Sequence, residues 1–300
     1  MNRRVAVLVL FLATAFVLAY LIDFLALIPA LRSHDKMATL VFGIARMYTP
    51  FVATVLAVKM LGLSIGKGLV RYGLRGGLAE YIVLGALIPY VLYALSVAIA
   101  VVIGMRIVNP VEELESLGAK LPVGGYLALV LVMLSALFNG STINTLAAIG
   151  EEIGWRGFLL GELGPRLGLY PAAVVIGIVW SLWHAPLILF AGYNYPHHPD
   201  LLGLTMFTAI CIAWSVIMCQ LRVLGRSILP PSFMHGNINA IAGIMLLTFE
   251  GDEMYTAPLG FLGLATSIIV ALTVGMLARN RLRYVELYEG SEEIFSDVEY

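Results

Sequence analysis

Charged side chains are scarce in this sequence. Asp, Glu, Lys and Arg make up 12% of the 300 residues, whereas 60% of the residues are hydrophobic. A soluble domain has roughly 25% charged residues, because its surface must contact water. This chain has too little charge to cover a water-exposed surface, so the composition indicates an integral membrane protein.

Cysteine and an excess of positive charge are lacking as well. The two cysteines, Cys211 and Cys219, lie in one apolar stretch, which excludes a fold held together by disulfides. The 18 Lys and Arg are balanced by 19 Asp and Glu, giving a net charge of −1. That balance excludes nucleic-acid binding through a basic surface.

Long apolar runs are what the sequence has instead. A membrane-spanning helix needs about 20 mostly apolar residues, because lipid offers the backbone no hydrogen-bond partners. Eight stretches meet this requirement, approximately Val5 to Ala30, Met37 to Leu61, Ala79 to Val108, Val123 to Gly150, Pro171 to Tyr193, Leu201 to Leu221, Leu229 to Phe249 and Pro258 to Leu277. We therefore expect an all-α, polytopic membrane helix bundle with about eight transmembrane helices.

The domain organisation is predicted to be simple. The first apolar run contains Asp23 and is followed by no cleavage pattern, so it is interpreted as a retained helix rather than a signal peptide. No repeat or long linker divides the chain. We expect one transmembrane catalytic domain over residues 1–285 and an acidic cytoplasmic tail over residues 286–300.

Basic residues are distributed unevenly between the two sets of loops. Eleven Lys and Arg precede the first run or follow the second, fourth, sixth and eighth runs, whereas the opposite loops contain four. The opposite loops also contain acidic clusters at Glu112–Glu115 and Glu250–Glu253. By the positive-inside rule, both termini are predicted to be cytoplasmic.

Polar residues within apolar runs are costly and indicate partners or function. The densest cluster is Glu151–Arg156. Glu152 and Arg156 are four residues apart, so they share a helix face and are expected to form an ion pair. Glu151 points elsewhere and has no local cation. A carboxylate of this kind suits a general base.

Two further runs offer polar groups at helical spacing. Trp180 and His184 are four residues apart in the fifth run, and Pro186 follows them. His235 and Asn239 have the same spacing in the seventh run. Each pair alone is explained by packing or interhelical hydrogen bonds, but the combination on three helices predicts a reaction site. His184 is about 20 Å along its helix from Pro171, which predicts either a helix that starts below the lipid or a deep site.

These three motifs resemble the signature of the CPBP family of intramembrane proteases, which includes Rce1-type CAAX proteases and bacteriocin-processing proteins. The family pattern is EExxxR, then FxxxH, then HxxxN or HxxxD, on separate membrane helices. The sequence matches its order and spacing, with Trp180 in place of the usual Phe.

The resemblance implies a catalytic set and a substrate class. The matching catalytic residues are Glu151, His184, His235 and Asn239, the supporting pair is Glu152 and Arg156, and Trp180 packs against or orients the site. The implied reaction is hydrolysis of a peptide bond near the C-terminus of a membrane-associated protein or peptide, with or without a prenyl group. Water would be activated by Glu151 and the oxyanion held by His and Asn, at a site opening to the cytoplasm.

Two cofactor hypotheses stay open. Glu151, His184 and His235, together with a water, are an acceptable ligand set for a catalytic zinc ion. Alternatively, the four polar groups bind the water and the oxyanion without a metal. The sequence has no His-Glu-x-x-His motif to favour zinc.

A non-catalytic scaffold and a proton-coupled transporter are the alternatives to a protease. A non-catalytic scaffold, such as a bacteriocin-immunity or processing factor of the same family, would keep the fold without turnover. A proton-coupled transporter would use the same Glu and His residues, but we find no inverted repeats. All polar positions of the family pattern are present, which favours the protease.

Some polar residues are interpreted as structural. Asp23 and Arg46 lie on neighbouring runs and are expected to pair with each other or with other charges. His197 and His198, between prolines in an outer loop, are expected to form a turn rather than a metal site.

Overall fold

The computed structural model describes residues 3–282, which form helices joined by short loops. The acidic tail predicted for residues 286–300 lies outside these residues. The first half of the chain contains α1 (Arg3–Ile22), η1 (Asp23–Leu27), α2 (Ile28–Arg32), α3 (Lys36–Met47), α4 (Thr49–Met60), α5 (Ile65–Arg71), α6 (Ala79–Ile103), α7 (Pro110–Ser116) and α8 (Gly125–Asn139). The second half contains η2 (Gly140–Asn144), α9 (Thr145–Glu152), η3 (Ile153–Leu159), α10 (Leu160–Leu167), α11 (Leu169–Ala191), α12 (Leu201–Leu224), α13 (Leu229–Thr248) and α14 (Phe261–Leu277).

Capping side chains and glycines mark several of the helix ends. The Asp35 carboxylate accepts the Ala38 N–H at the start of α3, and the Asp200 carboxylate accepts two N–H groups at the start of α12. Such side chains satisfy backbone donors that have no partner in the first turn. Gly104 and Gly192 end α6 and α11 with a positive φ, which glycine adopts without strain. The boundaries are therefore encoded locally.

All eight predicted apolar runs are helical, and the chain is a multi-pass membrane protein. Within residues 3–282, six helical segments are long and apolar enough to cross a membrane: Arg3–Arg32, Lys36–Met60, Ala79–Ile103, Gly125–Leu167, Leu169–Ala191 and Leu201–Leu224. The seventh run is α13, a 20-residue helix that carries the polar residues His235, Asn237 and Asn239. The eighth is α14, which is apolar but has 17 residues.

The fourth run is longer than predicted. We expected this helix to end near Gly150, but the helical segment continues from Gly125 to Leu167. Residues 151–160 are all buried. Arg156 pairs with Glu152 of the same helical segment, and Glu151 and Glu152 also contact Trp180 and His235 of neighbouring helices. These contacts let the helix continue where the charges begin. The continuation places Glu151 inside a long helical segment and not at its end.

Three π-helical segments interrupt the membrane helices, and each lies at a polar contact. The segment η1 begins at Asp23, η2 contains Gly140, and η3 directly follows Glu152. Short π-helical turns inside α-helices often occur at functional sites. In this fold they mark the helices that supply buried polar side chains.

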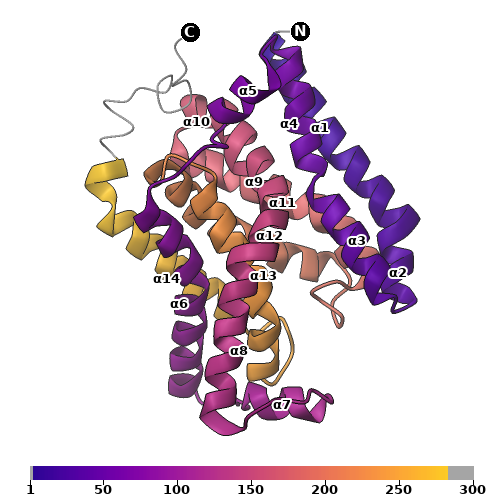
Figure 1. Ribbon diagram of the computed structural model, residues 1–300, viewed down its shortest axis with the longest axis vertical. Coiled ribbons are helices and arrows are strands. Elements are labelled where there is room, and N and C mark those ends of the chain that lie inside the picture. The colour runs from indigo at the N-terminus through magenta and orange to yellow at the C-terminus, as the bar shows by residue number, and fades with distance from the viewer. Residues whose placement is uncertain (1–2, 283–300) are drawn as a thin grey trace.

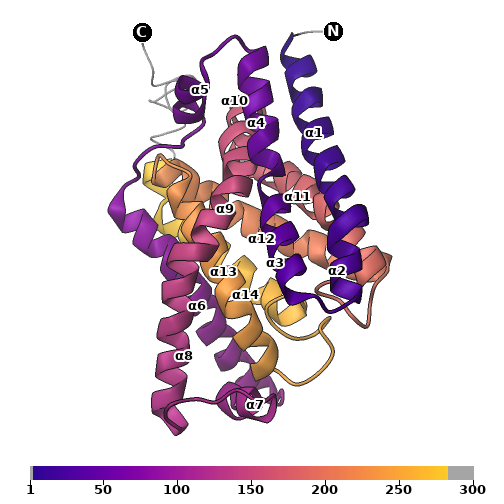
Figure 2. The ribbon, with the colours of Figure 1, turned by 45° about the vertical axis from the view of Figure 1, so that its right-hand side comes forward.

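The helix α13 lies in the middle of the bundle. It packs against α6, α8, α9 and η2, while α11 packs against α12, and α12 against α14. A side chain at Gly140 would collide with Asn237 of α13, so glycine lets these two helices approach closely. Figures 1 and 2 show α5 and α10 at one end of the molecule and α7 at the opposite end. This packing brings the predicted motifs of three helices together.

Candidate active site

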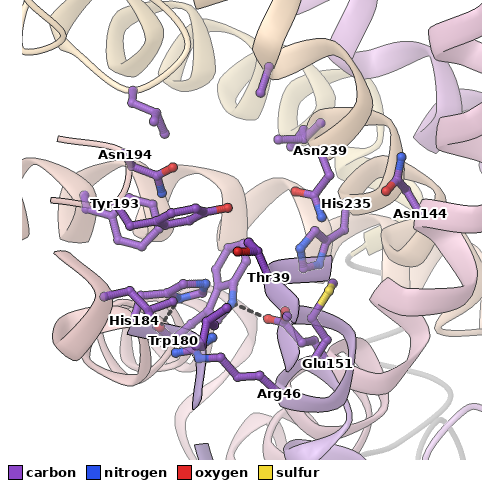
Figure 3. A pocket seen from close by; sticks show the side chains of 18 of the residues that line it. Thr39, Arg46, Asn144, Glu151, Trp180, His184, Tyr193, Asn194, His235 and Asn239 are labelled. Carbon is purple, nitrogen blue, oxygen red and sulfur yellow. Dashed lines mark hydrogen bonds between the residues drawn. The ribbon is translucent and has the colours of Figure 1, made fainter. Parts of the chain in front are cut away.

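A cavity of about 370 Å³ lies between α3, α9, α11, α12 and α13. Glu151, His184, His235 and Asn239 all line it, as Figure 3 shows. They come from the end of α9, the second half of α11 and the middle part of α13. The predicted catalytic residues therefore share one cavity, although they are far apart in the sequence.

Glu151 is held by two indole groups and by no cation. Its exposed fraction is 2%. The Nε1–H of Trp180 donates to Oε2 of Glu151 at 2.7 Å, and the Nε1–H of Trp155 donates to the same oxygen at 3.4 Å. No ion pair is formed by Glu151 within residues 3–282, as its isolated position in the motif predicts. The second carboxylate oxygen is left for a ligand in the cavity.

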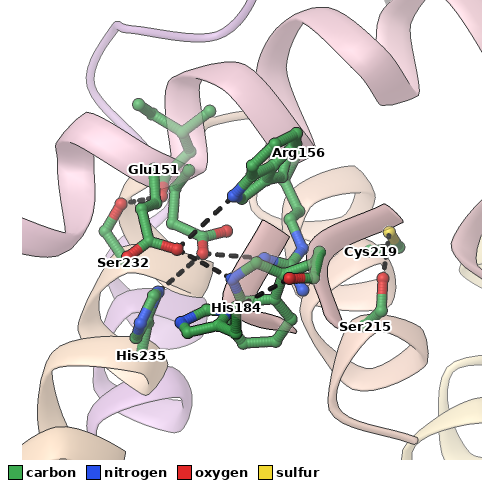
Figure 4. A network of polar contacts seen from close by, with 11 residues as sticks. Glu151, Arg156, His184, Ser215, Cys219, Ser232 and His235 are labelled. Atoms are coloured by element: carbon green, nitrogen blue, oxygen red, sulfur yellow. Dashed lines mark hydrogen bonds and ion pairs between the residues drawn. The ribbon is translucent and has the colours of Figure 1, made fainter. Parts of the chain in front are cut away.

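Glu152 links the predicted supporting pair to one of the histidines. Nη1 of Arg156 donates to Oε1 of Glu152 at 2.8 Å, which confirms the predicted ion pair. Nδ1 of His235 lies 2.8 Å from the same oxygen. A carboxylate can only accept, so Nδ1 of His235 must carry the proton of this hydrogen bond. Figure 4 shows Glu151, Arg156 and His235 in this network.

His184 is oriented by its own helix. Its Nδ1 donates to the Trp180 carbonyl oxygen at 3.0 Å, one turn earlier in α11. Both histidines therefore use Nδ1 for a structural hydrogen bond, which leaves Nε2 as the free nitrogen of each ring. The ring of His184 also packs edge-on against Trp183, with centroids 4.8 Å apart. The two imidazoles are thus fixed in tautomer and orientation.

Trp180 packs against both histidines and contacts Glu151 and Arg156 as well. Its ring centroid is 5.9 Å from that of His184 and 5.3 Å from that of His235. The guanidinium of Arg156 lies over the same indole, 4.4 Å from its centroid. The residue that departs from the family pattern is therefore a hydrogen-bond donor to Glu151 as well as a packing residue.

Asn239 lines the cavity without a hydrogen-bond partner in the described residues. Several other residues that line the cavity are not predicted by the sequence motifs. The amide of Asn239 makes no hydrogen bond within the described part of the chain and is exposed to the cavity. Asn144 lines the same cavity. The sequence could have predicted this position, because Asn144 precedes Glu151 by seven residues, or two helical turns, and therefore lies on the same helix face. Thr39, Arg46, Tyr193 and Asn194 also line the cavity, and no motif marks them.

The proposed zinc ligands share the cavity but do not fit an ion. Within residues 3–282, no three His, Cys, Asp or Glu side chains form a group that could hold a metal ion. One oxygen of Glu151 is also occupied by the indole of Trp180. The metal hypothesis therefore gains no support from this arrangement, and the chemistry proposed below uses the side chains alone.

The cavity leads outward towards three loops. A second hollow of about 600 Å³ shares Leu31, Tyr193 and Asn194 with it, and reaches His34, Pro196 and Gly251. We call this second hollow the mouth. The mouth lies at the C-terminal end of α11. His184 is near that end, which explains why it is far along the helix from Pro171.

Two histidine–carboxylate pairs join the loops at the mouth. Nδ1 of His197 lies 2.7 Å from Oε2 of Glu253, and Nε2 of His198 lies 3.0 Å from Oδ2 of Asp252. The hydrogen bond and charge of Glu253 raise the pKa of His197 above 6.5. The predicted turn is present at Tyr195–His198, where the His198 N–H donates to the Tyr195 carbonyl. We call these two pairs the loop clasp.

Comparison with known proteins agrees with the geometry. The family model of type II CAAX prenyl endopeptidases, Rce1-like, matches residues 125–241. Residues 125–241 of this chain are therefore similar to the Rce1-like family. This Rce1-like region contains all seven residues of the three motifs, and also Asn144.

A curated relative supports the same assignment. CAAX prenyl protease 2 of Methanococcus maripaludis is 32% identical to this chain over 117 residues. The matched region covers 38% of this chain and 43% of the relative. The chain thus matches less than half the length of this Rce1-like relative, and the helices α1–α7 and α14 are outside the family match.

Proposed function

We propose that this chain is an intramembrane endopeptidase that hydrolyses a peptide bond near the C-terminus of a membrane-associated, prenylated protein or peptide. The observation that carries the proposal is the buried carboxylate of Glu151, which faces the same cavity as the free Nε2 atoms of His184 and His235. These groups can activate one water molecule. The name of the relative, CAAX prenyl protease 2, supports the substrate class.

Glu151 acts as the general base in this proposal. Its free carboxylate oxygen takes a proton from a water molecule in the cavity, and the water oxygen attacks the scissile carbonyl carbon. The same carboxyl group then returns the proton to the amine nitrogen as the C–N bond breaks. General acid–base catalysis of this kind contributes about 10²–10⁴-fold to the rate.

The histidines and Asn239 have different tasks because of their hydrogen bonds. Nε2 of a neutral imidazole whose Nδ1 carries the proton is an acceptor, so one of His184 and His235 orients the attacking water by accepting the hydrogen that Glu151 does not take. An oxyanion needs donors, and the Asn239 amide is a donor without a partner in the described residues. We therefore assign the oxyanion to Asn239, and the orientation of water to one of the histidines.

The buried pair Glu152 and Arg156 fixes His235 rather than touching the substrate. Both side chains have an exposed fraction of 0%, so neither reaches the cavity. Glu152 holds the tautomer of His235, and Arg156 balances the charge of Glu152. A histidine held by a carboxylate in this way keeps one orientation through the reaction.

Cleavage of a fluorogenic farnesylated CAAX peptide by purified protein in detergent tests the proposal. The wild type is expected to turn over, and Glu151→Gln is expected to lose at least about 10²-fold in kcat, because the amide cannot take the proton. Glu115→Gln on the exposed surface of α7 is the matched control and should keep the wild-type rate. Equal rates for wild type and Glu151→Gln would contradict the assigned base. No turnover by a folded wild type would favour a scaffold.

Treatment with a chelator tests whether peptide cleavage requires a metal ion. A chelator is expected to leave the rate unchanged, because the donors of the cavity do not form a metal-binding group. Loss of activity with chelator and recovery with zinc would instead assign Glu151, His184 and His235 as ligands.

A further inference from the structure

One positive charge faces the cavity and takes no part in the chemistry described above. Arg46 of α3 is the single Lys or Arg among the residues that line the cavity, within the described part of the chain. It is 3% exposed, so nearly all of its side chain is enclosed by protein. A buried cation is costly and is retained where an anion or a function requires it.

Three contacts fix the guanidinium of Arg46 in one position. Nε donates to Oδ1 of Asp23 at 2.6 Å, and Nη2 donates to the Trp183 carbonyl oxygen at 2.6 Å. The predicted pairing of Asp23 and Arg46 is thereby confirmed. The guanidinium carbon also lies 3.5 Å from the ring centroid of Trp183. The same indole packs against His184, which places Arg46 beside the reaction site.

The remaining nitrogen of Arg46 is free to bind a ligand. No acceptor within residues 3–282 pairs with Nη1, and this atom is not among the buried polar atoms that protein shields completely. Its N–H groups are therefore accessible from the cavity, as the position of Arg46 below His184 in Figure 3 illustrates. An enclosed guanidinium with a free nitrogen binds carboxylates well, because its donors are already oriented.

We propose that Arg46 binds the free C-terminal carboxylate of the peptide that this chain cleaves. The proposal rests on the proposed function, which places the scissile bond near the C-terminus of the substrate. In a CAAX sequence the terminal carboxylate is three residues after the cysteine, or about 10 Å in an extended chain. A carboxylate brought that close to the site leaves water for a cavity enclosed by membrane helices, where it needs a cation.

The ion pair with Asp23 does not prevent this role. Asp23 is fully buried and contacts the Nε side of the guanidinium, whereas Nη1 is the free nitrogen. Asp23 therefore acts as a positioning residue that holds Arg46. The specificity predicted from this arrangement is for a free carboxylate, and not for an amide, at the end of the substrate.

Two peptides that differ only at the C-terminus test the assignment. Wild-type protein is expected to cleave a farnesylated CAAX peptide with a free carboxylate about 10- to 100-fold more efficiently, in kcat/KM, than its C-terminal amide. The double variant Asp23→Asn/Arg46→Met removes both charges, so that no buried carboxylate is left unpaired. It should cleave both peptides with the same efficiency. The double variant Glu250→Gln/Arg106→Met is the matched control and should keep the preference for the carboxylate, because it removes an exposed ion pair whose members line neither the cavity nor the mouth.

Binding to the Glu151→Gln protein separates this inference from the proposed function. Fluorescence anisotropy with the two labelled peptides should show the same preference for the carboxylate. Equal cleavage of both peptides by the wild type, or a preference that survives in the double variant, would overturn the role of Arg46 while leaving the protease intact. Tighter binding of the carboxylate without cleavage of either peptide would support Arg46 and overturn the protease.

Discussion

At the scale of single residues, the most informative contact is the hydrogen bond from Trp180 to Glu151. The usual residue in the family pattern is Phe, which has no N–H. Here the indole donates to the carboxylate at 2.7 Å and its ring separates the two histidines. Glu151 forms no ion pair within residues 3–282, and two indole N–H groups are its hydrogen-bond donors. Trp180 therefore acts as a positioning residue for the base.

Trp180→Phe is expected to lower kcat about 10- to 100-fold with little change in KM, because a hydrogen bond to a charged group contributes about 1.5–3 kcal/mol. Peptide cleavage measured over a range of substrate concentrations gives both constants. Trp214→Phe is the matched control, since Trp214 also lines the cavity but its indole donates to Ser267. An unchanged kcat in Trp180→Phe would mean that packing alone explains the residue.

At the scale of elements, the loop clasp joins the loop after α11 to the loop after α13. His197 is exposed, whereas its partner Glu253 has an exposed fraction of 7%. Burial of Glu253 opposes its ionisation, but the hydrogen bonds from His197 outweigh this effect and lower its pKa. The N–H of Met254 and the hydrogen bond with His198 lower the pKa of Asp252. In the loop clasp, the hydrogen-bonded pairing therefore favours the charged forms of His197, Asp252 and Glu253.

The clasp is expected to loosen as the pH rises above 6.5. The pKa of His197 is raised in the folded protein, so its contribution is complete below 6.5 and is lost as the pH rises through the higher folded value. The lowered pKa values of Asp252 and Glu253 act in the opposite direction. Their contributions are complete above 3.8 and 4.5, and are lost as the pH falls below these values.

Hydrogen exchange in the loop over residues 192–200 measures this effect. Wild type and His197→Gln are compared at each pH, so that the intrinsic pH dependence of exchange cancels. The wild type should exchange more slowly than the variant at about pH 6, and the difference should be smaller at about pH 8, because His197 loses its charge as the pH rises. The same difference at both pH values would contradict a contribution from the charge of His197.

At the scale of the whole molecule, the position of the mouth brings two sequence predictions into conflict. The mouth is lined by loops that contain His34, Pro196 and Gly251. The distribution of basic residues places these loops outside the cell, whereas the family resemblance implies a site that opens to the cytoplasm. Only one of these predictions can hold in this fold, because both refer to the same end of the bundle.

Labelling of single cysteines with a membrane-impermeant maleimide is expected to place α5 and the mouth on opposite sides of the membrane. Gly66→Cys in α5 and Ser33→Cys beside the mouth are both exposed. The natural Cys211 and Cys219 are fully buried and provide an unlabelled background. One variant should react in intact cells, and the other only after permeabilisation. Reaction of both from the same side would contradict the fold.

Which variant reacts in intact cells identifies the side on which the substrate enters. Labelling of Ser33→Cys in intact cells would support the charge distribution and place the mouth outside. Labelling of Gly66→Cys would support the cytoplasmic opening that the family resemblance implies. The two outcomes exclude each other.

The sequence alone determined the membrane class, the helical runs and the residues of the three motifs. Apolar runs of about 20 residues have few stable alternatives to a helix in lipid, so composition and length suffice for these predictions. The spacing of Glu152 and Arg156 likewise predicts their pairing, because neighbours on a helix face depend on local geometry.

Only the tertiary structure decided which distant residues meet at the cavity. Arg46 and Tyr193 are brought there by the packing of α3 and by the loop after α11, and no periodicity in their own segments indicates this. The length of the fourth helix also depended on tertiary packing, since buried partners let Glu151–Arg156 remain helical. The end of the bundle at which the cavity opens was decided in the same way, because it follows from the arrangement of loops that are far apart in the sequence.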